Sequence, residues 1–187
     1  GLYYDGTRNV AQLCVWNGST LALEGVAAWH WVSHTEITSV AIGDVDGDGS
    51  VEIVTGGSYY DGTRNVAQLC VWNGSTLTLE DVTTWYKVSD TFIYSVAIGD
   101  VDGDSYVEII TGGYYYDGSQ LFAQLCVWNG STLAQKDSTT WHWVQDACVY
   151  SVTVGDVDAD GLSEIITGGY YYDTIQSNAQ LVVWSIY

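Results

Sequence analysis

A repeat of 56 residues constrains the fold of this chain more than any other feature of its sequence. Tryptophans recur at this spacing at Trp16, Trp72 and Trp128, and segment 3–21 is repeated without change at 59–77. The 187 residues therefore hold 187/56, or about 3.3, copies of one unit. A unit of this size that cannot bury its apolar face alone folds by stacking on neighbouring copies.

Each unit is predicted to contain four short strands. In the middle unit, apolar and β-branched runs lie at 93–101 and 107–111, a third run lies at 122–128, and 139–144 alternates Trp with polar residues. β-branched and aromatic residues favour strands, and the Asn-Gly pair after the third run predicts a hairpin turn. No segment shows a sustained 3.6-residue apolar period, so no long helix is expected.

These units predict an all-β protein, an array of four-stranded antiparallel blades like those of a β-propeller, or less favourably another β-solenoid. Residues 1–187 are expected to form one array: a partial blade with the third and fourth strands at 1–35, blades at 36–91 and 92–147, and a partial blade with the first to third strands at 148–187. A closed propeller has about 4–8 blades, so the ring is incomplete in this chain. We therefore expect either a longer polypeptide or assembly with further copies, as an oligomer or fibre.

An acidic loop follows the first predicted strand of each unit. Alternate positions of a tight loop can point at one centre, and oxygen ligands suit Ca²⁺, which takes about 6–8 of them. The loops contain neither His nor Cys, which argues against zinc. Carboxylates occupy loop positions 1, 3, 5 and 9, which are Asp44, Asp46, Asp48 and Glu52; Asp100, Asp102, Asp104 and Glu108; and Asp156, Asp158, Asp160 and Glu164.

Up to three calcium sites follow from this pattern. Position 7 is Ser50, Tyr106 or Leu162, and such indifference to the side chain predicts a backbone carbonyl ligand there. Two unit charges about 4 Å apart interact by about 4 kcal/mol at an effective dielectric near 20, so four carboxylates need a cation or take up protons. Solvated acidic turns are the plainer interpretation, but the same four offsets recur three times. An EF-hand is disfavoured because strands flank the loop and its Glu is at position 9 instead of 12.

The charge of the chain excludes some partners. It has 23 acidic and 4 basic residues, a formal net charge of −19, which argues against nucleic acid and anionic membrane surfaces. Hydrophobic residues make up 47% of the chain, enough for a core. No apolar run reaches the roughly 20 residues of a membrane helix, so no membrane insertion is expected.

Three further patterns follow the repeat. Asn17, Asn73 and Asn129 each begin Asn-Gly-Ser, which predicts a hairpin turn and forms an N-glycosylation sequon in an exported protein. The cysteines at one repeat position give way to Val182 in the last unit, so buried free thiols are expected. Tyrosine clusters precede the turns between the second and third strands; packing between blades is the favoured interpretation, and stacking on sugars is the alternative.

The loop segments resemble a known family. The sequence SVAIGDVDGDG at 39–49, followed by a short strand and Thr-Gly-Gly, is similar to the FG-GAP (VCBS-type) repeat of integrin α-subunit propellers. The resemblance implies calcium ligands at loop positions 1, 3, 5, 7 and 9, between the first and second strands of a blade. Two departures matter: Glu at position 9 reaches one methylene further than the family's Asp, and Ser105 occupies a turn position that favours positive φ. The middle site is therefore expected to be the weakest.

The resemblance implies interaction surfaces and not chemistry. We expect a non-enzymatic, calcium-stabilised structural or adhesive propeller, outside the cell or at its surface, that assembles with further copies or blades; a surface fibre is one form that such an assembly can take. A lectin-like propeller that binds glycans is the first alternative. A polysaccharide-active enzyme is the second, because some polysaccharide lyases resemble this fold. No nucleophile–base set is visible, and the only basic residues are Arg8, Arg64, Lys87 and Lys136.

Overall fold

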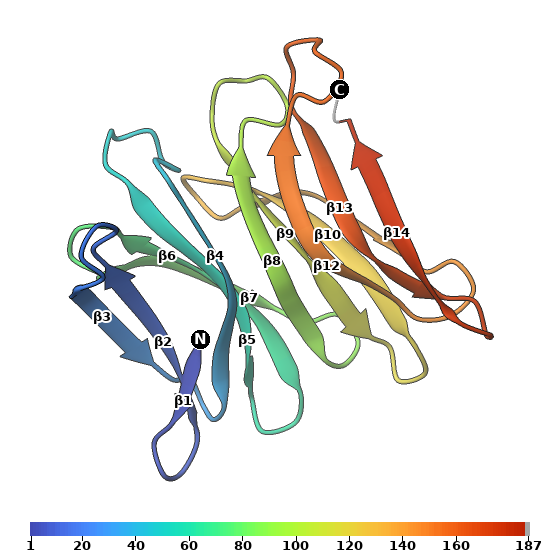
Figure 1. Cartoon of the computed structure of the whole chain (residues 1–187). Coiled ribbons are helices and arrows are strands. Elements are labelled where there is room, and N and C mark those ends of the chain that lie inside the picture. The colour runs from blue at the N-terminus through green and yellow to red at the C-terminus, as the bar shows by residue number, and fades with distance from the viewer. Residues whose placement is uncertain (186–187) are drawn as a thin grey trace.

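The structure, a computed structural model that describes residues 1–185, contains fourteen strands in four antiparallel sheets and no helix among these residues. Figure 1 shows the sheets following one another in chain order, from β1–β3 to β12–β14. The predicted all-β array of propeller-like, four-stranded blades is confirmed. The strands are β1 (Leu2–Tyr4), β2 (Asn9–Trp16), β3 (Leu23–Trp29), β4 (Thr35–Gly43), β5 (Glu52–Tyr60), β6 (Asn65–Asn73), β7 (Leu79–Trp85), β8 (Thr91–Gly99), β9 (Glu108–Tyr116), β10 (Leu121–Asn129), β11 (Gln135–Trp141), β12 (Ala147–Gly155), β13 (Glu164–Tyr172) and β14 (Ser177–Trp184).

Every sheet is a meander in which consecutive strands pair. The two inner sheets have the orders β4-β5-β6-β7 and β8-β9-β10-β11, and the last sheet has the order β12-β13-β14. The first sheet has the order β1-β2-β3. Its short strand β1 was not predicted, and it pairs with β2 from Leu2↔Ala11 to Tyr4↔Asn9. In terms of the repeat unit, β1 is the end of a second strand, and β2 and β3 are the predicted third and fourth strands.

The position of the fourth strand corrects the sequence prediction. We expected residues 139–144, but β11 begins at Gln135 and ends at Trp141. The Asn-Gly pair does not form a two-residue hairpin turn, because the residue with a left-handed backbone is Leu133, with φ of 50°. The Leu133 amide donates to the Asn129 carbonyl at 3.0 Å and closes a longer turn. The strand then starts immediately after this turn, and the Trp-rich segment ends it.

Apolar side chains are buried between sheets. Between the second and third sheets, Val54 and Leu69 face Ile93, Val96 and Trp128, and all five side chains are at most 6% exposed. A second cluster fills the space between the third and last sheets. Stacking of copies thus buries the sheet faces, as the repeat predicted.

A tryptophan pair recurs at each interface between sheets. Trp85 ends β7 and packs on Trp128 of β10 in the next sheet, with 4.5 Å between the ring centroids. The equivalent pairs are Trp29–Trp72 at 4.3 Å and Trp141–Trp184 at 5.1 Å. The Trp85 indole N–H also donates to Gln124 Oε1 of the next sheet at 3.0 Å. Equivalent bonds join Trp29 to Gln68 at 3.2 Å and Trp141 to Gln180 at 2.9 Å.

The first strands of neighbouring sheets are linked directly. The Val96 amide of β8 donates to Ser39 Oγ of β4 at 3.0 Å, and the Val152 amide of β12 donates to Ser95 Oγ of β8 at the same distance. Figure 1 shows β4, β8 and β12 as the strands through which successive sheets adjoin. These bonds fix the relative register of the acidic loops, because each loop begins where a first strand ends.

Gly113 on β9 is required by close backbone approach. An added Cβ would lie 1.9 Å from the Phe92 carbonyl oxygen, so the two strands must separate to admit it. We expect Gly113→Ala to lower the free energy of unfolding by about 1–3 kcal/mol, as overpacking does. Gly155→Ala, where no atom lies within 4 Å of the added Cβ, is the matched control. Urea unfolding of both variants checks this, and equal stabilities would contradict it.

Candidate metal centre

The acidic loops join the first and second strands of the last three sheets. The pairs Gly43↔Glu52, Gly99↔Glu108 and Gly155↔Glu164 close them at their bases. The glutamate at position 9 is thus the first residue of the second strand, and its side chain is buried: Glu52 is 2%, Glu108 0% and Glu164 3% exposed. Each loop therefore has a buried carboxylate at its base.

Backbone amides curl each loop around its carboxylates. In the first loop, the amides of Gly47 and Gly49 donate to the two oxygens of Asp44 at 2.7 and 2.9 Å. The Val45 amide donates to Glu52 Oε2 at 2.9 Å. The same bonds recur in the other two loops. These amides orient the carboxylates but carry only partial charges, so the negative charge of the loop remains.

Positions 4 and 6 of every loop have a left-handed backbone. Glycine fills both in the first loop, but Ser105 occupies position 6 of the middle loop with φ of 69°. The predicted positive φ at Ser105 is confirmed. Ala159, at position 4 of the third loop, has φ of 65°, which was not predicted although Ala stands there where the other loops have Gly. Each of these residues adopts a conformation that costs about 1–2 kcal/mol outside glycine.

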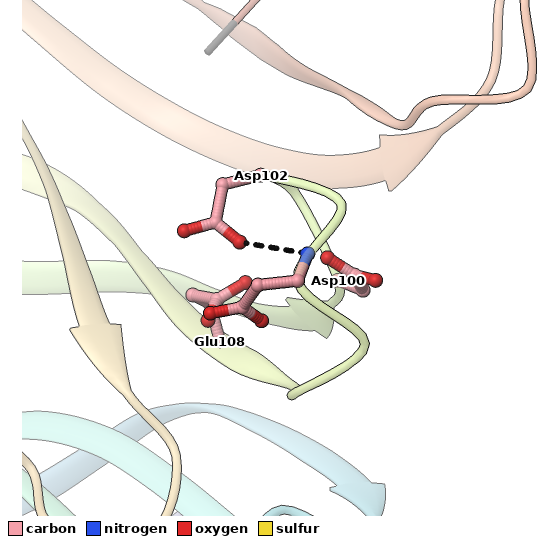
Figure 2. A group of neighbouring side chains, drawn as sticks. Asp100, Asp102 and Glu108 are labelled. Carbon is pink, nitrogen blue, oxygen red and sulfur yellow. Dashed lines mark hydrogen bonds between the residues drawn. The ribbon is translucent and has the colours of Figure 1, made fainter. Parts of the chain in front are cut away.

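The predicted carboxylates come together to different extents. Within a group, one oxygen of each carboxylate lies within 4.8 Å of those of the other members, a spacing that a single cation can bridge. Figure 2 shows Asp100, Asp102 and Glu108 of the middle loop drawn into one small region. Glu52 and Asp160 lie outside their groups. The groups are Asp44, Asp46 and Asp48; Asp100, Asp102, Asp104 and Glu108; and Asp156, Asp158 and Glu164.

This donor set fits Ca²⁺. All side-chain donors are carboxylate oxygens, which hard cations prefer, and three or four carboxylates plus a carbonyl approach the 6–8 oxygens of a calcium shell. The backbone carbonyls of Ser50, Tyr106 and Leu162 stay predicted ligands.

The charge of the first loop is not balanced by side chains. Burial raises the pKa of Glu52, and the carboxylates of Asp46, Asp48 and Glu80 raise it further. Ionisation of Glu52 is therefore less favourable than that of a free glutamate. A divalent ion among these oxygens would reverse that effect.

Lys136 is the site residue that the sequence analysis missed. Its ammonium reaches from β11 to the middle loop and lies 2.6 Å from Asp102 Oδ2, 2.9 Å from Glu108 Oε1 and 3.3 Å from Asp104 Oδ2. These hydrogen bonds raise the pKa of Lys136, with Asp102 and Glu108 as the largest causes. The pKa of Asp104 is lowered, first by the Tyr106 amide and then by Lys136. The available signal was a basic residue at a repeat position where Glu24 and Glu80 stand.

The remaining predicted positions fall outside the metal loops. Asn17, Asn73 and Asn129 begin the turns after β2, β6 and β10, as predicted, and their side-chain carbonyls accept amide hydrogen bonds within the turn. Glycosylation of these residues stays a prediction. The expected free thiols are confirmed for all four cysteines; Cys70, Cys126 and Cys148 are buried as expected, whereas Cys14 is half-buried. Burial raises the pKa of Cys70 and Cys126 to about 12. Within residues 1–185, no helix has the length and apolar character needed to cross a membrane.

Two comparisons relate the chain to known proteins. A family model described as the FG-GAP repeat matches residues 92–122. Integrin alpha-8 from Gallus gallus is 36% identical to the chain over 75 residues, which cover 40% of this chain. The match spans only 7% of the length of that integrin. The segment matched by the family model contains the whole middle acidic loop, where four carboxylates converge.

Proposed function

The chain carries an integrin-like FG-GAP repeat at residues 92–122, and on that basis we propose that it is a non-enzymatic adhesive propeller module. It acts outside the cell or at its surface, its blades are stabilised by Ca²⁺, and it assembles with further blades or copies of the same protein, up to a surface fibre. The grouping of carboxylate oxygens within 4.8 Å of one another in all three acidic loops is the observation that carries this proposal.

The calcium would be structural. The carboxylates of each loop, together with the position-7 carbonyl, would hold an ion between the end of the first strand and the start of the second. Binding there neutralises the buried glutamate and joins two strands of one sheet. The first loop also contacts the next sheet, because Ser131 Oγ donates to the Asp46 carbonyl at 3.4 Å. An ordered loop therefore supports the packing between sheets as well.

A binding role agrees with the repetition of the site. The same acidic loop recurs in three sheets, whereas catalysis requires one unique constellation of nucleophile, base and stabilising groups. The polar groups that recur across the interfaces, such as Trp85 and Gln124, bond to each other and hold the blades together.

Assembly is supported by the two outward faces of the array. Trp16 is 55% exposed, although its counterpart Trp128 is 4% exposed. On the last sheet, Leu181 is 73% exposed, although its counterpart Leu69 is fully buried. These faces are the two halves of the interface that is buried between the inner sheets. Contact between them is heterologous, so it closes a ring or extends a fibre.

A bead-aggregation assay tests homotypic adhesion. Beads coated with the chain are expected to aggregate in millimolar calcium and to disperse in chelator. Leu181→Asp places a charge on the outward face of β14 and is expected to abolish aggregation. Ile175→Asp changes an 83% exposed residue in the preceding turn and serves as the control, with circular dichroism to confirm that both variants fold. Beads that stay dispersed in calcium, or equal aggregation of both variants, would count against the proposal.

One observation favours the lectin-like alternative. Tyr94, Tyr114, Tyr150 and Tyr170 form a continuous aromatic cluster across the third and last sheets, with neighbouring ring centroids 5.5 Å apart. Tyr150 is 56% exposed, and an exposed ring can stack on a sugar. Glycan-array binding that Tyr150→Ala removes would favour this alternative over adhesion between copies.

A further inference from the structure

Lys136 stands where the repeat otherwise places a glutamate. Counting back by 56 residues gives Glu80 and then Glu24. Glu80 Oε1 accepts a hydrogen bond from Asn73 Nδ2 at 2.9 Å and adds a further negative charge beside the first loop. In the next sheet, the same position on the fourth strand instead delivers an ammonium to the middle loop.

The ammonium contacts most of the carboxylates of the middle loop. It bonds three of the four loop carboxylates, from Asp102, Asp104 and Glu108, at 2.6 to 3.3 Å. Among the three loops of the described chain, this is the one in which all four carboxylates converge. In the first loop, which has Glu80 in place of the lysine, Glu52 stays outside the group, and in the third loop Glu164 belongs to the group but Asp160 does not. Within residues 1–185, neither of the other loops has a Lys or Arg within 4.0 Å of its carboxylates.

We propose that Lys136 is a built-in cation of the middle loop, which takes the place of Ca²⁺ there, so that calcium binds tightly only to the first and third loops. The inference rests on the proposed calcium sites and refines them. Calcium–oxygen distances are about 2.3–2.6 Å, so an ion bonded to Asp102, Asp104 and Glu108 would occupy the space that Nζ fills. The two positive charges also repel, so calcium enters only after the lysine has left.

The three loops therefore differ in how far their order depends on calcium. The middle loop is held by a covalently attached cation and stays ordered whatever the calcium concentration. The first loop, with Glu52 and Glu80 but no lysine, depends on the ion. Calcium depletion therefore loosens the first and third loops and leaves the middle one folded.

Calcium titration by isothermal calorimetry tests the inference on the full chain. The probe is calcium chloride, and the variants are Lys136→Met, which keeps the stem and removes the charge, and Lys136→Glu, which restores the repeat residue. We expect the wild type to bind two ions tightly and both variants to bind a third at least tenfold more tightly than the wild type does. Lys87→Met removes the other lysine, which is exposed, lies over the Tyr115 ring at 5.6 Å and forms no ion pair with a loop carboxylate among the described residues, and it should titrate like the wild type. Identical titrations of the wild type and Lys136→Met would overturn the inference.

A second readout separates this inference from the calcium proposal. In chelator, Lys136→Met should melt below both the wild type and Lys87→Met, because four carboxylates lose their cation. If no variant binds calcium, the proposed calcium function fails, and the melting temperatures alone decide on the lysine. A lower value for Lys136→Met then still supports it as the resident cation, and equal values for the two methionine variants refute it.

Discussion

Replacing Trp128 with alanine is expected to lower the free energy of unfolding by about 3–5 kcal/mol, the usual cost of removing a buried Trp. The Trp128 ring is 4% exposed and packs on Trp85 of the preceding sheet at 4.5 Å between centroids. Its indole N–H donates to Thr111 Oγ1 at 3.0 Å, so the change also leaves a buried hydroxyl without this partner. The substitution therefore weakens the packing between the second and third sheets and removes a hydrogen bond between β9 and β10 within the third sheet.

Trp16 provides the matched control for this substitution. It occupies the same repeat position, with the same Val-Trp-Asn-Gly context, but is 55% exposed on the first sheet. Trp16→Ala is expected to change the free energy of unfolding by less than about 1 kcal/mol. Chemical denaturation of both variants in the same buffer makes the comparison. Equal losses would show that the interface between sheets does not stabilise the array.

Removing calcium is expected to produce the second large effect. A site of the weak extracellular class has a Kd of about 10⁻⁴ M, so calcium at about 10 mM is in 100-fold excess and adds about 2.7 kcal/mol per site. For a chain of 187 residues, 1 kcal/mol shifts the melting temperature by about 2–4 °C. Each occupied site should therefore raise it by about 5–10 °C. Thermal melts in calcium and in chelator measure the shift.

Two controls make the melting experiment specific. Magnesium at the same concentration should stabilise the chain much less, because it demands a smaller octahedral shell and keeps its water. Asp44→Asn removes a ligand of the first loop and should reduce the calcium-dependent shift, whereas Asp5→Asn, in a turn outside the loops, should leave the shift unchanged. A melting temperature that is the same in calcium and in chelator would refute a structural role of the ion.

The sequence sufficed for the architecture because the repeat records it directly. The 56-residue spacing located the acidic loops between first and second strands, and the structure places all three there. The positive φ of Ser105 could be predicted in the same way, since its counterparts in the other loops are Gly49 and Gly161. Position within a unit was thus more informative than composition.

The bounds of the fourth strand and the contact of Lys136 with the middle loop were not predicted from the sequence. The start of the fourth strand depends on the left-handed backbone of Leu133. The Asn-Gly pair, which favours a tight turn, gave no indication of this conformation. The contact of Lys136 with the middle loop depends on a side chain of β11 reaching past β10 to the start of β9, and its one sequence signal is the basic residue at a repeat position that Glu24 and Glu80 otherwise hold. The bonds from Trp85 to Gln124 cross between sheets and were also missed, although both residue types recur with the 56-residue period.

A high-resolution crystal structure of the chain grown in millimolar calcium is the most direct test of metal binding by the acidic loops. We expect calcium density, identified by its anomalous signal, among Asp44, Asp46 and Asp48 and among Asp156, Asp158 and Glu164, with oxygens at about 2.3–2.6 Å. In the middle loop we expect the Lys136 ammonium. First and third loops without an ion, with their carboxylates turned out into solvent, would contradict the assignment.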